Sequence, residues 1–120
     1  MVQNNNNYSI QGNKLIISGN EIIFDHEIKD ILEISDMLIV LMLRPTGITP
    51  NRNIYGVSIT TKKIKWQIAK LSAKDDDENC PFVGIKYYKN QLYLNNWCDV
   101  YLIVDPLTGE ILERGLPGKY

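Results

Sequence analysis

Residues 54–66 read Ile54-Tyr-Gly-Val-Ser-Ile-Thr-Thr-Lys-Lys-Ile-Lys-Trp66, and a related stretch follows near the C-terminus. The second copy, Tyr101-Leu-Ile-Val-Asp-Pro-Leu-Thr-Gly-Glu-Ile-Leu-Glu113, matches the first without a gap at an offset of 47 residues. In both copies an apolar run ends at a small polar or acidic residue, a short bend with a threonine follows, and apolar residues then alternate with polar ones. This order predicts a strand, a tight turn and a second strand, which make a β-hairpin.

The correspondence extends upstream of the hairpin. Ser35–Val40, a turn followed by an apolar strand, aligns with Lys89–Leu94, and a weaker third copy covers Gly12–Asp25. The repeating unit is therefore about four antiparallel strands in roughly 45–50 residues, which is the period of propeller blades. The predicted fold class is all-β, with about ten short antiparallel strands in two to three blade-like sheets that form a partial, or half, β-propeller.

Three further segments carry expectations about local structure. The apolar run Met37–Leu43 predicts a strand buried on both faces. The dipeptides Gly12-Asn13 and Gly19-Asn20 predict hairpin turns, because these residues tolerate positive φ. Residues 26–34 fit a helical stripe as well as a strand; the order of the repeat favours the strand.

Length, composition and net charge limit the domain organisation, the partners and the cellular compartment that we expect. A chain of 120 residues with 44% hydrophobic residues can build a core as one all-β domain without a metal or disulfide; we expect it at 8–115, after a disordered N-terminus at 1–7 and before a tail at 116–120. Net charge is −1, and no apolar run approaches the roughly 18 residues that span a bilayer, so neither nucleic acid nor a membrane is an expected partner. The polar N-terminus is not a secretory signal, and a chain with two cysteines and no signal is expected in the cytoplasm. Whether Cys80 and Cys98 pair stays open.

The repeat resembles that of pyrroloquinoline-quinone-type β-propellers. In that family the third strand of each blade ends at Asp, turns through Thr-Gly and leads into a last strand that closes on Trp. Asp105, Thr108 and Gly109 keep the turn in the second copy, and Trp66 keeps the closing aromatic residue in the first, where we expect it in the core; Glu113 replaces it in the second. The resemblance implies a partial, open propeller, since about two and a half blades cannot close a ring. It implies no cofactor, and we expect none.

The sequence carries no pattern typical of catalysis or metal binding. His26 is the one histidine of the chain, so neither a hydrolytic triad nor a histidine-based metal site is supported. Thr60–Lys63 lacks the glycines of a phosphate-binding loop and is expected to be a hairpin turn. The contiguous acids at 75–78 do not have the alternating spacing of a calcium loop. They are either a solvated loop or a binding loop for a basic partner.

Charge segregation and aromatic residues suggest where a partner binds. Between Glu21 and Asp36 there are six acids and one base, whereas Met37–Lys74 has seven bases and no acid. Such blocks favour oriented docking, unless neighbouring sheets simply pair their opposite charges. Tyrosine and tryptophan are frequent anchors of interfaces, although pleat alternation predicts that one of two adjacent tyrosines faces inward. The predicted partner-binding residues are Asp75, Asp76, Asp77, Glu78, Tyr87, Tyr88 and Trp97.

These observations predict a non-enzymatic, monomeric protein-binding module. Its most concrete form is a bacterial immunity protein that binds and occludes the active site of a cognate toxin, with a nuclease as the expected toxin class. In that form the acidic loop imitates the nucleic acid that a basic active site expects. The alternative is a shortened propeller-like module with a ligand-binding or enzymatic role, or a propeller fragment that assembles with itself.

Overall fold

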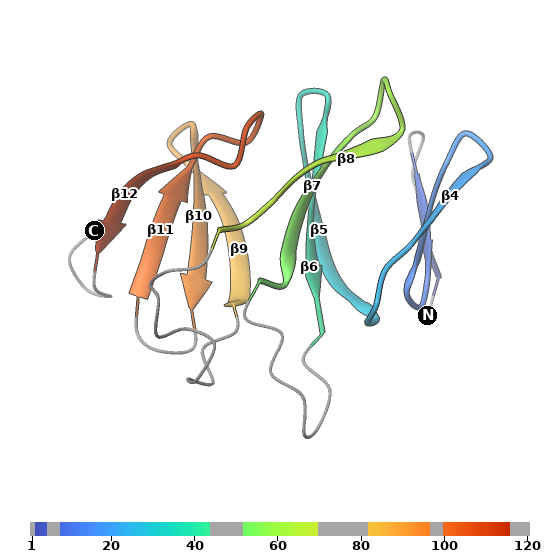
Figure 1. Cartoon of the computed structure of the whole chain (residues 1–120), viewed down its shortest axis with the longest axis horizontal. Helices are drawn as coiled ribbons and strands as arrows, with labels where there is room; N and C mark the ends of the chain where they lie inside the picture. Colours follow the sequence, from blue (N-terminus) through green and yellow to red (C-terminus); the bar gives the residue numbers. More distant parts are fainter. Residues whose placement is uncertain (1, 5–7, 44–51, 70–81, 97–99, 116–120) are drawn as a thin grey trace.

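The computed structural model describes residues 2–4, 8–43, 52–69, 82–96 and 100–115 of the chain. Within these ranges the chain forms twelve β-strands and no helix, so the described residues contain no helix that could cross a membrane. The strands form three antiparallel sheets of four consecutive strands each. Figure 1 shows the sheets side by side in a row, with the second between the other two. The predicted all-β class with blade-like sheets is therefore confirmed.

The strands follow one another in sequence order within each sheet. The first sheet consists of β1 (Val2–Asn4), β2 (Ser9–Gln11), β3 (Lys14–Ile17) and β4 (Asn20–Ile23). The middle sheet consists of β5 (Ile28–Ile34), β6 (Met37–Met42), β7 (Ile54–Ser58) and β8 (Lys63–Gln67). The third sheet consists of β9 (Phe82–Tyr88), β10 (Gln91–Asn96), β11 (Val100–Val104) and β12 (Ile111–Gly115). Strand β1 precedes the predicted start of the domain at Tyr8 and pairs with β2.

Left-handed backbone conformations allow the tight turns between strands. The β3–β4 turn uses Ser18 (φ 48°) and Gly19 (φ 85°), one residue earlier than the expected turn at 19–20. The β9–β10 turn uses Lys89 (φ 50°) and Asn90 (φ 65°). Two-residue hairpin turns need positive φ at these positions because only then does their twist match that of the flanking strands. Strand β5 also resolves the ambiguity of residues 26–34 in favour of the strand.

The two related hairpins, β7–β8 and β11–β12, have turns that are closed by equivalent hydrogen bonds. In the first, the backbone N–H of Lys62 donates to the carbonyl oxygen of Ser58 (2.8 Å); in the second, that of Gly109 donates to Asp105 (2.7 Å). Lys62 and Gly109 both adopt positive φ, at 59° and 74°. The repeat seen in the sequence therefore corresponds to one turn conformation used twice.

A register irregularity also recurs at the same place in both hairpins. The pairing shifts after Gly56, which lies opposite Trp66. In the second hairpin the pairing shifts after Ile103, which lies opposite Glu113. A bulge of this kind bends a strand and increases its twist. The aligned positions of the two copies therefore share strand, turn and bulge.

The core lies on the two faces of the middle sheet. Strand β6 is buried along its whole length, as the unbroken apolar run predicts. Its alternate side chains enter different clusters, because successive residues of a strand point to opposite faces. The cluster toward the first sheet contains Tyr8, Ile10, Leu15, Ile17, Phe24, Ile31, Leu38, Val40, Met42 and Val57. The cluster toward the third sheet contains Ile34, Met37, Ile39, Leu41, Ile54, Trp66, Ile68, Phe82, Ile85, Leu92, Leu94, Leu102 and Val104.

Polar contacts from Trp66, Asn53 and Lys29 join the middle sheet to the third, and the Lys29 Nζ donates to the carbonyl oxygen of Val83 in β9 (3.0 Å). The indole N–H of Trp66 donates to the carbonyl oxygen of Pro106 in the β11–β12 turn (2.9 Å), and the ring is buried, as the sequence predicts. The buried Asn53 amide donates to the carbonyl oxygens of Met42 (3.1 Å) and Phe82 (2.9 Å), and its side-chain oxygen accepts from the Phe82 N–H (2.8 Å). These contacts position the third sheet, which carries the candidate site.

Candidate functional site

The described structure includes two of the seven residues predicted to bind a partner. Asp75, Asp76, Asp77, Glu78 and Trp97 lie outside the described residues, as do both cysteines. Tyr87 and Tyr88 are the last two residues of β9 and are both exposed, at 45% and 48%. Tyr87 lies opposite the core residue Leu92 and so occupies the core-facing side of the sheet, as pleat alternation predicts, but its side chain is not buried there. Strand β9 is the edge strand of its sheet, so its side chains have a strand neighbour on one side only.

The outer face of the third sheet is the face turned away from the middle sheet. Along each strand, the residues between those of the core cluster point to this outer face. They include Lys86, Tyr88, Tyr93, Asn95, Tyr101, Ile103 and Glu113. Three tyrosines cross it diagonally from β11 to β9: Tyr101, Tyr93 and Tyr88. The rings of Tyr93 and Tyr101 are 5.9 Å apart between centroids, at an interplanar angle of 43°. Exposure rises along the diagonal from 4% at Tyr101 to 9% at Tyr93 and 48% at Tyr88.

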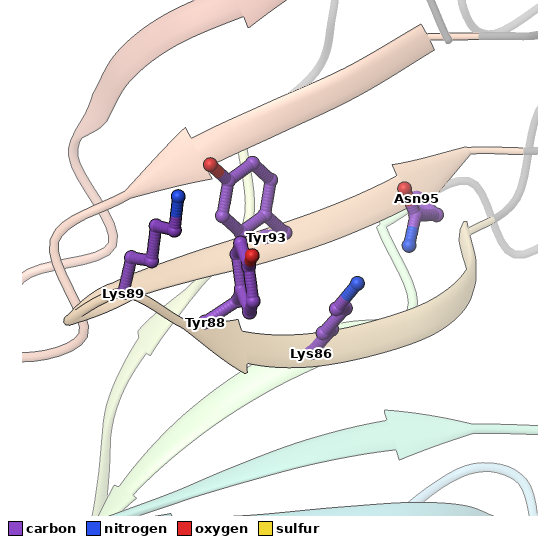
Figure 2. Close-up of a pocket in the computed structure, with 5 residues that line it drawn as sticks. All are labelled: Lys86, Tyr88, Lys89, Tyr93 and Asn95. Atoms are coloured by element: carbon purple, nitrogen blue, oxygen red, sulfur yellow. The ribbon is translucent and has the colours of Figure 1, made fainter. Parts of the chain in front are cut away.

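A cavity of about 360 Å³ opens beside the exposed end of this diagonal. We call it the Tyr88 cavity; its lining residues, all from the β9–β10 hairpin, are Lys86, Tyr88, Lys89, Tyr93 and Asn95. Figure 2 shows Tyr88 between the two lysines. The Nζ atom of Lys86 lies 4.9 Å from the centroid of the Tyr88 ring, and that of Lys89 lies 5.3 Å from it. Both distances are within the range of a cation–π contact.

The Tyr88 cavity is rich in positive charge. Neither Lys86 nor Lys89 forms an ion pair with any residue in the described ranges. Glu113 lies on the same face, but it is on β12, two strands away from Tyr93, and its Oε2 accepts a hydrogen bond from the Tyr101 hydroxyl (3.4 Å). Both ammonium groups therefore lie beside the Tyr88 ring on exposed side chains, and neither contacts a described carboxylate.

A second polar cluster links the β5–β6 turn to the β7–β8 turn. One carboxylate oxygen of Asp36 accepts from the Ser58 hydroxyl (2.8 Å), and the other accepts from the backbone N–H (3.0 Å) and the hydroxyl (2.6 Å) of Thr60. Hydrogen bonds from the side chains of Thr60 and Ser58 lower the pKa of Asp36. Each of these polar atoms is used in tying the turns together, so the cluster is structural. Thr60, Thr61 and Lys62 lie in the hairpin turn, as expected, and Lys63 is the first residue of β8.

The described side chains do not assemble a metal centre. Across the ranges that the structure covers, no group of three or more His, Cys, Asp and Glu residues lies close enough to hold a metal ion. His26 is half-buried in the segment between β4 and β5.

Sequence reasoning missed four of the five residues of the Tyr88 cavity. The signal was present in the turn at Lys89-Asn90, because a two-residue turn determines which residues of the flanking strands lie opposite each other. That pairing puts Lys86 opposite Tyr93 and Asn95 opposite Gly84 on one face. The residues were interpreted as strand and turn without being assigned to a face.

Comparisons with known proteins support the fold and leave the activity open. Residues 5–116 match the model of a family described as "Domain of unknown function (DUF7957)". None of the curated proteins matches the chain significantly. Among solved structures, the computationally designed Ika8 protein is similar with a TM-score of 0.62 at 11% identity, over 95% of this chain and 35% of that one. The computationally designed Ika4 protein gives a TM-score of 0.61 at 11% identity, over 95% of this chain and 69% of that one.

Proposed function

We propose that this chain, which belongs to the DUF7957 family, is a non-enzymatic protein-binding module whose binding surface includes the outer face of the third sheet. The observation that carries the proposal is Tyr88, an exposed aromatic residue between two lysines at the edge of an end sheet. Tyrosine suits such a role because it buries a large area, loses little side-chain entropy and keeps a hydroxyl for hydrogen bonding.

Rigidity behind Tyr88 supports an anchoring role. Tyr93 and Tyr101 are almost fully buried and continue the diagonal across β10 and β11. Gly115 makes this packing possible, because a Cβ atom there would lie 2.5 Å from the Tyr101 ring. A partner that binds Tyr88 would therefore press on a packed surface, and little ordering would be needed on binding.

The most concrete version of the proposal is an immunity protein in the bacterial cytoplasm that occludes the active site of a toxin, in particular a nuclease. The acidic residues Asp75, Asp76, Asp77 and Glu78 support it, since they lie only four to seven positions before Phe82, the first residue of β9, and would steer a basic partner toward this edge. Trp97, directly after β10, is a further contact in this version. The open row of three four-stranded sheets supports the related proposal that the chain derives from pyrroloquinoline-quinone-type propeller blades.

Affinity capture from the source cells tests the binding role. The full chain is compared with the double variant Tyr87→Ala/Tyr88→Ala and with Ile23→Ala, a matched control that truncates an exposed side chain (67%) on the first sheet. We expect one dominant captured protein that the control retains and the double variant loses, since removal of an anchor residue costs about 2 kcal/mol or more in binding. Equal capture by all three proteins would exclude the outer face of the third sheet.

The toxin version needs a second measurement. The captured protein is purified, and its nuclease activity is titrated with the full chain. Complete inhibition at one equivalent supports occlusion of an active site. Binding that leaves activity unchanged, or a captured protein without nuclease activity, would overturn the nuclease version and leave the binding role intact.

A further inference from the structure

The two lysines of the Tyr88 cavity point to the chemistry of the group that binds there. We propose that the cavity is an oxyanion subsite, which takes a carboxylate or phosphate group between Lys86 and Lys89. The group is either an acidic side chain of the protein partner or a free small organic anion. An acidic side chain of a partner is the source of the group only if the proposed protein-binding function is correct. Binding of an oxyanion in the cavity does not depend on that function.

Charge balance is the first argument. Lys86 and Lys89 both approach the ring of one tyrosine, at 4.9 and 5.3 Å from its centroid, and neither pairs with a described acid. Two ammonium groups that share one ring repel each other, and an anion between them would relieve that repulsion. The rings of Tyr88 and of the buried Tyr93 line the cavity, and apolar walls of this kind concentrate the field of nearby charges.

The hydrogen-bonding inventory gives the second argument. The two ammonium groups supply donors and no acceptor, and the side-chain amide of Asn95, on the Lys86 side of the cavity, adds two N–H donors and one acceptor oxygen (Figure 2). The Tyr93 hydroxyl already donates to the Oε1 of Gln91 (3.3 Å). Donors thus outnumber acceptors, and the complementary ligand is one with acceptor oxygens, as carboxylates and phosphates have.

The size of the cavity limits the ligand. A volume of about 360 Å³ is near the lower end of the range of small-molecule pockets. Both lysines also lie at the Tyr88 ring, where a stacked base would otherwise bind. The site therefore suits a side chain or a small anion better than a nucleotide.

The first sheet offers an internal contrast. On its outer face Lys14 is neutralised by Glu21, with Nζ 3.4 Å from Oε1. These residues occupy neighbouring strands, β3 and β4. The outer face of the first sheet therefore pairs its lysine with an acid. On the outer face of the third sheet, Lys86 and Lys89 have no such acidic partner among the described residues.

Titration of the isolated full chain tests the inference without any protein partner. Backbone amide shifts of the ¹⁵N-labelled protein are followed with sodium phosphate, sodium benzoate and a short peptide that contains two glutamates, each at constant ionic strength set with NaCl. We expect saturable shifts at Lys86, Tyr88 and Asn95 with at least one probe. Saturation by phosphate or benzoate identifies a free-anion site, and saturation by the peptide alone identifies a protein carboxylate.

Variants separate charge from the aromatic wall. Lys86→Gln/Lys89→Gln should weaken binding of the saturating probe about tenfold or more, because charge-assisted hydrogen bonds are lost. Lys14→Gln, the control on the first sheet, should bind as the wild type does. Absence of saturation with all three probes, or equal affinity of the double variant, would overturn the oxyanion subsite. Neither result would contradict the protein-binding role, which the capture experiment tests independently.

Discussion

The hairpins β7–β8 and β11–β12 share their turn, their bulge and their register, yet they end on different side chains. In the first, Trp66 lies opposite Gly56; in the second, Glu113 lies opposite Ile103. The glycine is needed because a Cβ atom at position 56 would lie 2.1 Å from the indole nitrogen of Trp66. The first hairpin thus pairs a large residue with glycine, whereas the second has two residues of intermediate size, Ile103 and Glu113, at the equivalent positions.

The difference between the hairpins follows from what lies next to each. Trp66 packs against the β11–β12 turn of the third sheet, whereas Glu113 is exposed on the outer face, where the described chain has no further sheet. We infer that the turn residues determine the backbone conformation that the two hairpins share. The residue at the end of the hairpin, Trp66 or Glu113, differs according to whether another sheet packs against it. Substitutions at Trp66, Gly109 and Asp36, compared with their counterparts or controls, test the comparison between the two copies.

The largest effect is expected at Trp66. Trp66→Ala should lower the free energy of unfolding by about 3–5 kcal/mol, because it removes a buried aromatic residue and the hydrogen bond to Pro106. Glu113→Ala, the equivalent change in the second hairpin, should change stability by about 0.5 kcal/mol or less, as at most surface positions. Urea denaturation followed by circular dichroism measures both. Equal losses for the two variants would contradict the proposed difference between the hairpins.

A smaller effect is expected at Gly109. Its φ of 74° is unfavourable for residues with a side chain, and a Cβ atom would lie 2.6 Å from the Trp66 ring. Gly109→Ala should therefore cost about 2–3 kcal/mol, from backbone strain of about 1 kcal/mol and overpacking. Lys62→Ala, at the equivalent turn position with φ 59°, is the matched control and should cost about 0.5 kcal/mol or less.

The contribution of the tryptophan can be isolated in a double variant. In a Trp66→Ala background, Gly109→Ala should cost only about 1 kcal/mol, because the steric conflict with the ring is gone and the backbone strain is left. An undiminished cost in that background would show that Gly109 is required for the turn alone.

The smallest effect concerns Asp36, whose carboxylate bridges two turns in the middle sheet, whereas the second copy has Asn90 at the aligned position. Hydrogen bonds from Thr60 and Ser58 hold the pKa of Asp36 below its ordinary value. A carboxylate with a depressed pKa contributes stability above its unfolded pKa, near 4, and that stability is lost as pH falls through the folded pKa. Asp36→Asn should therefore be less stable than the wild type at pH 7.

The pH dependence distinguishes this contribution from a general defect. The difference in urea midpoint between wild type and Asp36→Asn should shrink as pH falls from about 5 to about 2, since a protonated Asp36 resembles the amide. A difference that stays constant over this range would mean that the charge of Asp36 does not contribute.

Much of the fold was predictable because its signals are local. Two-residue turns, the apolar run of β6 and the alignment of the two hairpins identify the sheets, and Trp66 is buried as expected. Asn53 was not predictable as a buried residue, since its partners Met42 and Phe82 are distant in sequence and only the packing of two sheets brings them together. Strand β1 was missed for a similar reason, since Gln3 and Asn4 are polar and the strand is defined by its pairing with β2.

The candidate site was predictable in part. Tyr88 was predicted, together with Tyr87, to bind a partner, but the lysines beside it were not, because the sequence does not state which face of β9 is covered. Alternation predicts the face of Tyr87 but not its burial, since Tyr87 lies opposite Leu92 on the core-facing side and is still 45% exposed at the sheet edge. The toxin-binding hypothesis rests on residues 75–78 and 97, which lie outside the described ranges, and stays a prediction.

The buried amide of Asn53 has a mechanical consequence. Two apolar sheet faces attract each other without a preferred offset, so hydrophobic contact alone permits one sheet to shear along the other. Asn53 bonds to the first residue of β9, and Trp66 bonds to the turn at the far end of β11, so directional bonds clamp the third sheet near both of its ends. Asn53 and Trp66 therefore help to set the angle at which the third sheet presents its outer face, although neither side chain lies on the binding surface that we propose.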